Sequence, residues 1–169
     1  MDISFNKTNG VAAVYFIKKF MTKFPELKYL VLVIKAFLKT RGLNETFHGG
    51  LSSYLVTILV ISYLLEIKKF ETDKQLLLSE HLLNFFELYG TKFNYRDLGL
   101  SIRKGGFYFK RSDRDWENFQ KPISLCVENP QDPTIDIGRA SHRFTDVHSA
   151  FQHAYDTLKF NSSQHKSIL

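Results

Sequence analysis

The sequence predicts a mainly α-helical domain of the α+β class with one small β-hairpin, and changes in hydrophobic period support this prediction. Up to about residue 90, apolar residues recur at the three- and four-residue spacing of helix faces. Leu98, Leu100 and Ile102 then alternate with other residues, as in a strand. Phe107 and Phe109 continue the alternation beyond a Gly-Gly pair, which is typical of a hairpin. A helical pattern returns near residue 144.

The first half of the chain predicts three helices. Residues 1–6 alternate and indicate the end of a strand. A first helix ends before Pro25 and has the apolar stripe Val14, Ile17, Met21 and Phe24. Residues 27–38 are apolar on almost every side, so we expect this helix in the middle of the domain. Residues 40–50 form a loop, and residues 51–65 a further, largely buried helix.

The second half predicts two helices around the hairpin. Thr72-Asp73 offers a cap for a fourth helix, whose expected inward residues are Leu78, Leu82, Phe85 and Phe86. Residues 111–121 form a charged connection, and residues 122–127 a short extended segment. The last helix has an apolar face made of Phe144, Val147, Phe151, Ala154 and Leu158. We expect the tail from Asn161 to fray.

Composition limits the class of protein. The chain has 169 residues, of which 44% are hydrophobic, with a formal charge of +6 and a pI near 9.3. These values indicate one globular domain, and the charge suits either a polyanionic partner or an ordinary basic surface. The single cysteine, Cys126, excludes an internal disulfide and lies in an apolar context typical of a core residue. The uncharged segment 51–65 is too short to cross a bilayer, so neither a membrane nor a secretion signal is predicted.

Two neighbouring segments could bind an anion. Lys35 and Lys39 stand four residues apart, so both project from one face of an apolar helix. They could hold phosphates or simply extend to water. After Gly49-Gly50, the hydroxyls of Ser52 and Ser53 open a helix, where anions are favoured, although either hydroxyl could instead cap that helix.

The acids and histidines do not predict a metal centre. His148 and His153 are five residues apart, which favours surface positions over a shared metal site. Asp113 and Asp115 have the D-x-D spacing of a metal-binding pair, but their loop is highly charged and no strand fixes it. We therefore disfavour a catalytic role for them.

The segment NPQDPTIDIGRASHRF, residues 129–144, has the chemistry of a rigid loop. Its prolines fix φ, Gly138 permits unusual backbone geometry, and Asp136 can cap the turn through its own side chain. These features suit a surface connection as well as a recognition loop.

Several stretches, taken in order, resemble one family. LVLVIKAFLKTRGLNE, GGLSSYLV, FFELYGTKFNYRDLGLSIRKGG and VENP followed by DIGRAS are similar to the noncanonical poly(A) RNA polymerases, the topoisomerase-related-function branch of the polymerase β-like nucleotidyltransferases. The resemblance runs from Asp2 to about Lys159. It implies a helical central, PAP-associated nucleotide-recognition domain at residues 9–160. Residues 1–8 would be a remnant of the catalytic palm, which is otherwise lacking, and residues 161–169 a tail.

The resemblance also implies roles for individual residues. Family members add nucleotides, usually adenylates from ATP, to RNA 3′ ends, with three palm carboxylates holding two Mg²⁺ (or Mn²⁺) ions. Asp2 matches the third carboxylate, which is catalytic and binds metal. The implied nucleotide-binding residues are Asn9 at the sugar, Lys35 and Lys39 at the triphosphate, Ser53 beside it, Tyr54 stacked on the base, and Asn129, Ile135, Asp136 and Arg139 in the recognition loop.

Departures from the family pattern shape the functional prediction. The G-S and D-x-D motifs of the palm should precede Asp2. Asn129 stands where aspartate is usual, and Ile135 stands where uridylating relatives have histidine and adenylating ones often asparagine. We expect the ATP-preferring C-terminal part of an RNA 3′-end nucleotidyltransferase, inactive alone. The alternative is a non-catalytic module that binds RNA, nucleotide or a partner. By family analogy, the expected setting is a nuclear surveillance complex with a zinc-knuckle RNA-binding protein and a helicase.

Overall fold

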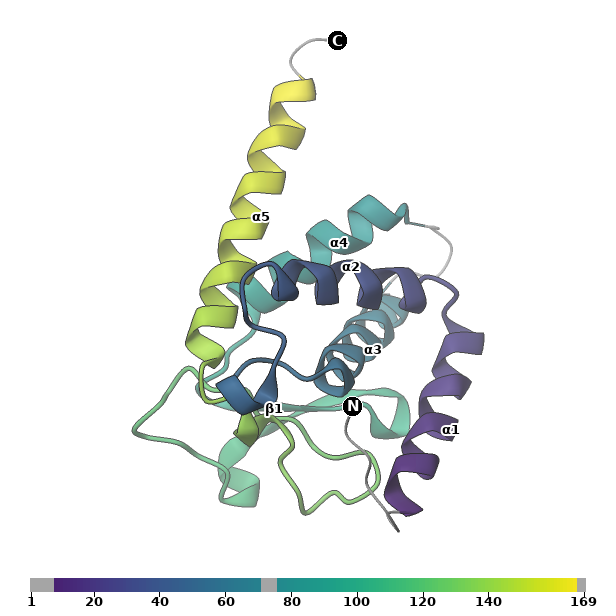
Figure 1. Ribbon diagram of the computed structural model, residues 1–169, viewed down its shortest axis with the longest axis vertical. Coiled ribbons are helices and arrows are strands. Elements are labelled where there is room, and N and C mark those ends of the chain that lie inside the picture. The colour runs from purple at the N-terminus through teal and green to yellow at the C-terminus, as the bar shows by residue number, and fades with distance from the viewer. Residues whose placement is uncertain (1–7, 71–75, 167–169) are drawn as a thin grey trace.

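A computed structural model describes residues 8–70 and 76–166 as a helical body with a short hairpin at one end (Figure 1). The long helices are α1 (Thr8–Lys23), α2 (Leu27–Lys39), α3 (Ser53–Phe70), α4 (Leu78–Glu87) and α5 (Phe144–Lys166). Strands β1 (Leu98–Ser101) and β2 (Phe107–Lys110) form the hairpin, so the expected mainly helical class is confirmed. The expected strand at residues 1–6, Asp2 and Thr72-Asp73 lie outside the described residues.

Helix α3, rather than α2, forms the centre of the core. Its residues from Leu55 to Leu65 are almost all buried, because the helix is apolar on every side. Helix α2 packs on α3 and α4 and buries one face, made of Leu27, Leu30, Ile34 and Leu38. Its other face is open: Tyr29 is 56% exposed and Leu32 64%. The expectation that residues 27–38 lie in the middle is therefore wrong, since apolar composition does not determine which element covers a face.

Among the described residues, no helix combines the length and apolarity that a bilayer span requires.

The buried stripe of α1 differs from the expected one. Of the expected residues, Phe24 is buried and Ile17 half-buried, but Val14 and Met21 are exposed. Phe16 and Phe20, which were not expected, pack against the core together with Phe24. Their four-residue spacing keeps the three rings on one side of the helix, and the rings of Phe16 and Phe20 meet edge to face at 5.1 Å. Phenylalanine buries more apolar area than valine or methionine, so these rings determine which face turns inward. The helix ends at Lys23, ahead of Pro25, as expected.

Helices α4 and α5 pack against each other through aromatic rings. Phe85 and Phe86 of α4 contact Phe151 of α5, with ring centres 5.6 and 5.5 Å apart. Helix α4 begins at Leu78 with Leu77 as its N-cap residue, and the Leu77 N–H donates to Glu80 Oε2 at 2.7 Å, so a cap at Thr72-Asp73 is not what starts it. Two expected inward residues are exposed, Leu78 to 42% and Leu158 to 37%. Helix α5 continues to Lys166, past the start of the expected tail at Asn161.

The hairpin gains a third extended segment. Strands β1 and β2 pair antiparallel with Leu100 opposite Tyr108. Leu100 also pairs in parallel with Val127: its N–H donates to Cys126 O at 3.0 Å, and Glu128 N–H donates to Leu100 O at 2.9 Å. This pairing confirms an extended segment near residues 122–127 and fixes the start of the loop that follows it.

Candidate nucleotide-binding site

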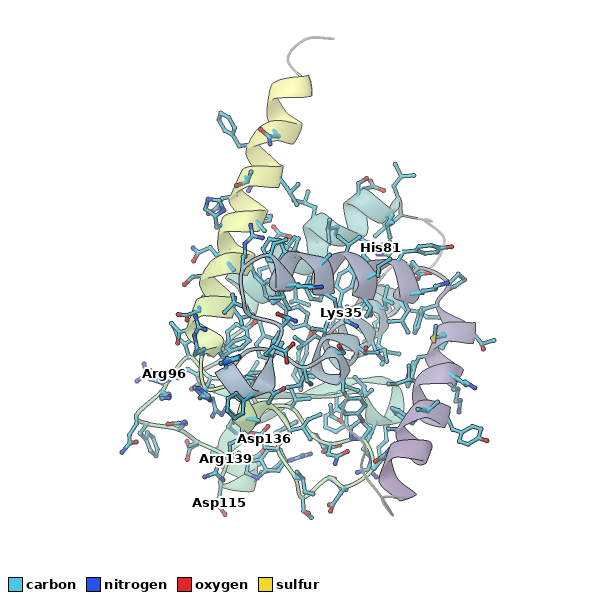
Figure 2. All side chains as sticks on the ribbon, viewed as in Figure 1. Lys35, His81, Arg96, Asp115, Asp136 and Arg139 are labelled. Carbon is cyan, nitrogen blue, oxygen red and sulfur yellow. The ribbon has the colours of Figure 1, made fainter. Side chains whose placement is uncertain are left out.

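Lys35, Lys39 and Ser53 line one hollow of about 240 Å³ between α2 and the start of α3. Both lysines are exposed, and within the described part of the chain neither makes an ion pair. Lys35 is marked on α2 in Figure 2. The apolar lining includes Leu32 and Val56. The hollow therefore places two ammonium groups and one hydroxyl around a space open to an anion.

The two serines before α3 have different positions. Ser52 Oγ accepts a hydrogen bond at 3.1 Å from Leu55 N–H, which is the geometry of an N-cap. Ser53 begins the helix and faces the hollow. The sequence did not determine which of the two serines caps the helix, and the structure shows that Ser52 does. Tyr54 is partly buried against the core and lines neither this hollow nor the larger one below. Burial raises the pKa of its phenol above the ordinary value.

Residues 128–142, here called the recognition loop, are closed by their own backbone. Asn129 N–H donates to Ile135 O and Ile137 N–H donates to Val127 O, both at 2.9 Å. Asp136 Oδ1 accepts from Val127 N–H at 2.9 Å and Gly138 N–H at 2.8 Å. The expected capping of the turn by Asp136 is therefore confirmed. Burial raises the pKa of Asp136, and the two N–H donors offset only part of this effect.

Other side chains of the recognition loop reach solvent. Ile135 is 45% exposed and Arg139 is also exposed. With Asp136 they line a second hollow of about 710 Å³, whose far wall is formed by residues 115–125. Figure 2 shows Asp115, Asp136 and Arg139 at the same end of the molecule. Asn129 Oδ1 accepts from Gln131 N–H at 3.0 Å and so stabilises the turn beside it.

Six of the expected site residues thus divide between two hollows, Tyr54 and Asn129 line neither, and the backbones beside the two hollows are joined. Ser141 Oγ donates to Gly50 O at 3.1 Å, and Arg143 N–H donates to Gly49 O at 2.9 Å. Gly49 has φ +79°, and a Cβ there would lie 2.4 Å from His142 Nε2. The left-handed φ is what favours glycine here, since the exposed His142 ring could move away from a Cβ. The end of the recognition loop is therefore fastened to the turn that leads into Ser53.

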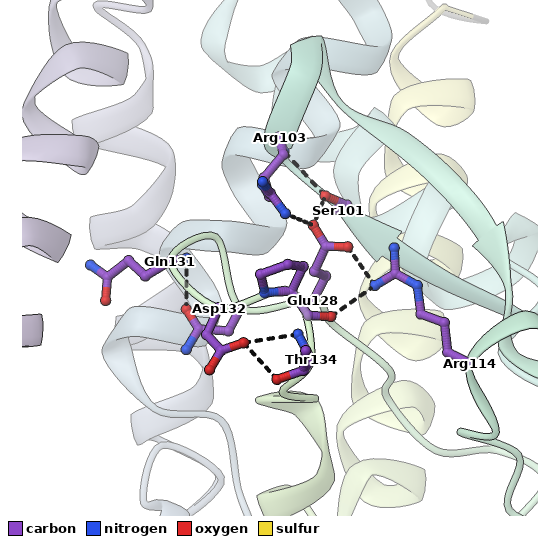
Figure 3. Close-up of polar contacts among 9 residues, drawn as sticks. Ser101, Arg103, Arg114, Glu128, Gln131, Asp132 and Thr134 are labelled. Carbon is purple, nitrogen blue, oxygen red and sulfur yellow. Dashed lines mark hydrogen bonds and ion pairs between the residues drawn. The ribbon is translucent and has the colours of Figure 1, made fainter.

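The recognition loop begins with a buried carboxylate that sequence reasoning missed. Glu128 is 1% exposed; its Oε1 accepts from Ser101 Oγ at 2.7 Å and lies 3.7 Å from Arg103 Nη1, and its Oε2 pairs with Arg114 (Figure 3). The sequence did contain a signal for this buried carboxylate. Glu128 directly follows the apolar run ISLCV, and an acid that is buried with such a run needs a partner.

The described residues do not form a metal centre. Among them, no group of three or more histidine, cysteine or acidic side chains could hold an ion. His153 is exposed as expected, but His148 is half-buried beside the Tyr95 ring, and burial lowers its pKa. Asn9 lies in the first turn of α1, and its side chain, like Asp2, is outside the description. The Mg²⁺ or Mn²⁺ ion that the resemblance implies therefore has no fitting ligand set in the described residues.

Comparisons with known proteins show which enzymes the chain is similar to. Residues 77–135 match the family model described as Cid1 family poly A polymerase. The chain is 40% identical over 161 residues to the poly(A) RNA polymerase CID14 of Cryptococcus neoformans, covering 94% of this chain and 21% of that protein. A solved polymerase core of TRAMP, a RNA surveillance complex, is 36% identical with a TM-score of 0.80, covering 90% of this chain and 49% of that one. A Cid1 poly(U) polymerase structure with magnesium and 3′-dATP bound shares the fold at 21% identity, with a TM-score of 0.75 over 92% of this chain and 58% of that one.

These similarities define the class first: the fold is that of part of a polymerase β-like nucleotidyltransferase. The chain is similar to noncanonical poly(A) RNA polymerases along 94% of its length, and its residues 77–135 match the model of their PAP-associated region. It spans about a fifth of the length of the CID14 relative and about half of the solved TRAMP polymerase chain.

Proposed function

We propose that this chain is the nucleotide-recognising part of an RNA 3′-end nucleotidyltransferase of the poly(A) polymerase type. The observation that carries the proposal is that Lys35, Lys39 and Ser53 all line the same hollow. Two compact cations and a hydroxyl at a helix start suit the oxygens of a triphosphate. The fastening of the recognition loop to Gly49 and Gly50 supports a site in which phosphate and base are held by one piece of backbone.

Within the recognition loop we assign different tasks to the expected residues. Ile135 and Arg139 are exposed and available to a nucleotide, and Asn129 lies near the loop's start. Outside the loop, the partly buried Tyr54 in the first turn of α3 would supply the stacking ring. The Asp136 carboxylate already accepts two backbone N–H bonds, so its task is to shape the loop. Because isoleucine offers no hydrogen-bond donor, adenine from ATP suits this loop better than uracil.

The remaining roles follow the family. Asp2 would act as a catalytic, metal-binding carboxylate and Asn9 would contact the nucleotide sugar. The substrate would be an RNA 3′ end, with Mg²⁺ or Mn²⁺ as cofactor. A zinc-knuckle RNA-binding protein and a helicase would be partners in the nucleus, an expectation supported by the similarity to the TRAMP polymerase core. No catalytic step is assigned to the described residues.

Lysine substitutions test the phosphate site. Replacing Lys35 or Lys39 by methionine keeps the apolar stem and removes the charge. We expect either change to weaken ATP binding about tenfold, the effect of one lost charge-assisted contact, with an unchanged melting temperature. Equilibrium dialysis with labelled ATP measures the affinity. Lys28→Met is the matched control, because Lys28 is exposed on the same helix and does not line the hollow. Equal ATP affinity in all three variants and the unaltered chain would contradict the proposal.

A further inference from the structure

Arg114 stacks on rings of its own part of the chain and also contacts the recognition loop, fourteen or more positions further on. Its guanidinium carbon lies 3.7 Å from the centre of the Phe109 ring in β2 and 5.1 Å from that of Trp116. The Nη1 atom pairs with Glu128 Oε2 and also donates to Pro133 O at 3.4 Å (Figure 3). The side chain is only 23% exposed. Arg114 therefore lies between the hairpin and the back of the recognition loop.

The orientation of the Glu128 carboxylate, and so of its ion pair with Arg114, is fixed by other contacts. Its carboxylate is held on the other oxygen by Ser101 Oγ and Arg103, and its backbone is paired with Leu100 in the extended ladder. A planar guanidinium can stack on a ring and donate to two acceptors at once, whereas an ammonium group cannot do all three. Residue 114 therefore needs the stacking plane and the several donors of an arginine, which lysine does not provide.

The outer turn of the recognition loop, residues 130–134, is held mainly by hydrogen bonds of its own. Asp132 Oδ1 accepts from the backbone and the hydroxyl of Thr134, and Asn129 Oδ1 accepts from Gln131 N–H. Across the described residues, the hydrogen bonds of this turn are local except for the one from Arg114 to Pro133 O. Ile135, at 45% exposure, follows directly.

We propose that Arg114 is a positioning residue for nucleotide selection. It acts through Pro133 and Glu128 and holds the outer turn so that Ile135 is presented in one orientation to the base. The proposal rests on the proposed function, because it assumes that the loop faces a nucleotide. It also gives a role to the Asp113-Arg114-Asp115 motif: the arginine between the two acids is the residue that turns inward.

The test compares Arg114→Met and Arg114→Lys with Arg96→Met, a control at an exposed arginine outside the loop and the network. Equilibrium dialysis of the full chain gives the affinities for ATP and UTP, and hydrogen exchange gives the protection of the Asn129 and Ile135 amides. We expect Arg114→Met to reduce the ATP-to-UTP affinity ratio about fivefold to tenfold and to speed exchange of both amides. Arg114→Lys should recover part of the loss, and Arg96→Met should show none.

Removing Arg114 alone leaves a buried carboxylate with one distant cation, and this could unfold the chain. The double variant Arg114→Met/Glu128→Gln removes that charge and keeps the acceptor for Ser101, so it should melt near the unaltered chain yet still lose selectivity. An unchanged affinity ratio and unchanged exchange in the folded double variant would overturn the proposal. If the unaltered chain binds neither nucleotide, the proposed function fails, and unchanged exchange at Ile135 would then separately overturn the fastening role of Arg114.

Discussion

Ile135 is the residue at which base preference can be tested most directly. Its side chain is exposed in the recognition loop and offers no donor to a pyrimidine carbonyl. If that carbonyl is buried on binding, an unmet hydrogen bond costs about 1–3 kcal/mol, so ATP should be preferred over UTP. We expect Ile135→His to shift the preference toward UTP. The measurement is incorporation of ATP and UTP by an active relative in which residues 8–166 replace the corresponding segment.

Ile123→His is the matched control for this experiment. Ile123 is 40% exposed and lines the same larger hollow, but it lies outside the recognition loop. The control should leave the ratio of ATP to UTP incorporation unaltered. Equal incorporation of ATP and UTP before substitution would contradict a base-selecting role for Ile135. A change in the incorporation ratio with Ile123→His alone would contradict it as well.

Cys126 predicts a dependence of stability on pH. Burial first, and then the nearby Asp136 carboxylate, raise the pKa of this thiol from 9.0 to about 12. The unfolded thiol therefore loses its proton near pH 9 while the folded one keeps it, and the contribution to stability, complete below pH 9, is lost as pH rises toward 12. Burial also raises the pKa of Tyr89, Tyr95 and Tyr108. Comparison with Cys126→Ala isolates the thiol: denaturant unfolding between pH 8 and 11 should show a shallower decline in the variant. Parallel declines would show that the thiol contributes nothing.

Among the structural elements, the recognition loop owes its shape to Asp136. Asp136→Ala leaves the N–H groups of Val127 and Gly138 without their acceptor and should cost about 1–3 kcal/mol for each group that stays buried. Asp136→Asn keeps an acceptor oxygen and should cost much less. Urea unfolding measures both variants. If Asp136→Ala weakened ATP binding at full stability, Asp136 would be a nucleotide contact instead.

The elements differ in how far the sequence could predict them. Residues 55–65 of helix α3 are mostly apolar and almost all buried, as their composition predicted, and the hairpin forms where the two-residue period predicted it. Helix α2 is apolar on every side as well, yet Leu32 is exposed, because burial depends on a covering element that composition does not name. In α1 the pattern allowed two stripes, and the larger phenylalanine rings determined the outcome.

The candidate site shows the same limit. Spacing on one helix placed Lys35 and Lys39 on a common face, and the hollow they share with Ser53 agrees with that reasoning. The pairing of Arg114 with Glu128 joins residues fourteen positions apart through tertiary structure, and no local spacing predicts it. Contacts made by neighbouring turns of one element were therefore predictable, whereas contacts between loops were not.

For the whole molecule, the open face of α2 predicts association. Tyr29 and Val33 stand four residues apart on this face and are 56% and 40% exposed. Contiguous exposed apolar surface favours contact with a partner or with a second copy. We expect Tyr29→Lys/Val33→Lys to reduce self-association, measured by sedimentation velocity over a range of concentrations. Leu158→Lys, at an exposed apolar position on α5, should have little effect. A chain that is monomeric throughout before any substitution would contradict this expectation.

The division of tasks within residues 128–142 also bears on how such a protein can diverge over generations. Gly138 could not become even alanine without a shift, since a Cβ there would lie 2.5 Å from Leu125 O. Ile135 points outward and takes no part in closing the loop with its side chain, so many replacements there should leave folding intact. If Ile135 contacts the base as proposed, mutations that alter the preferred base are thus separated from mutations that destroy the fold. A lineage could exchange one nucleotide for another by single, individually tolerated steps.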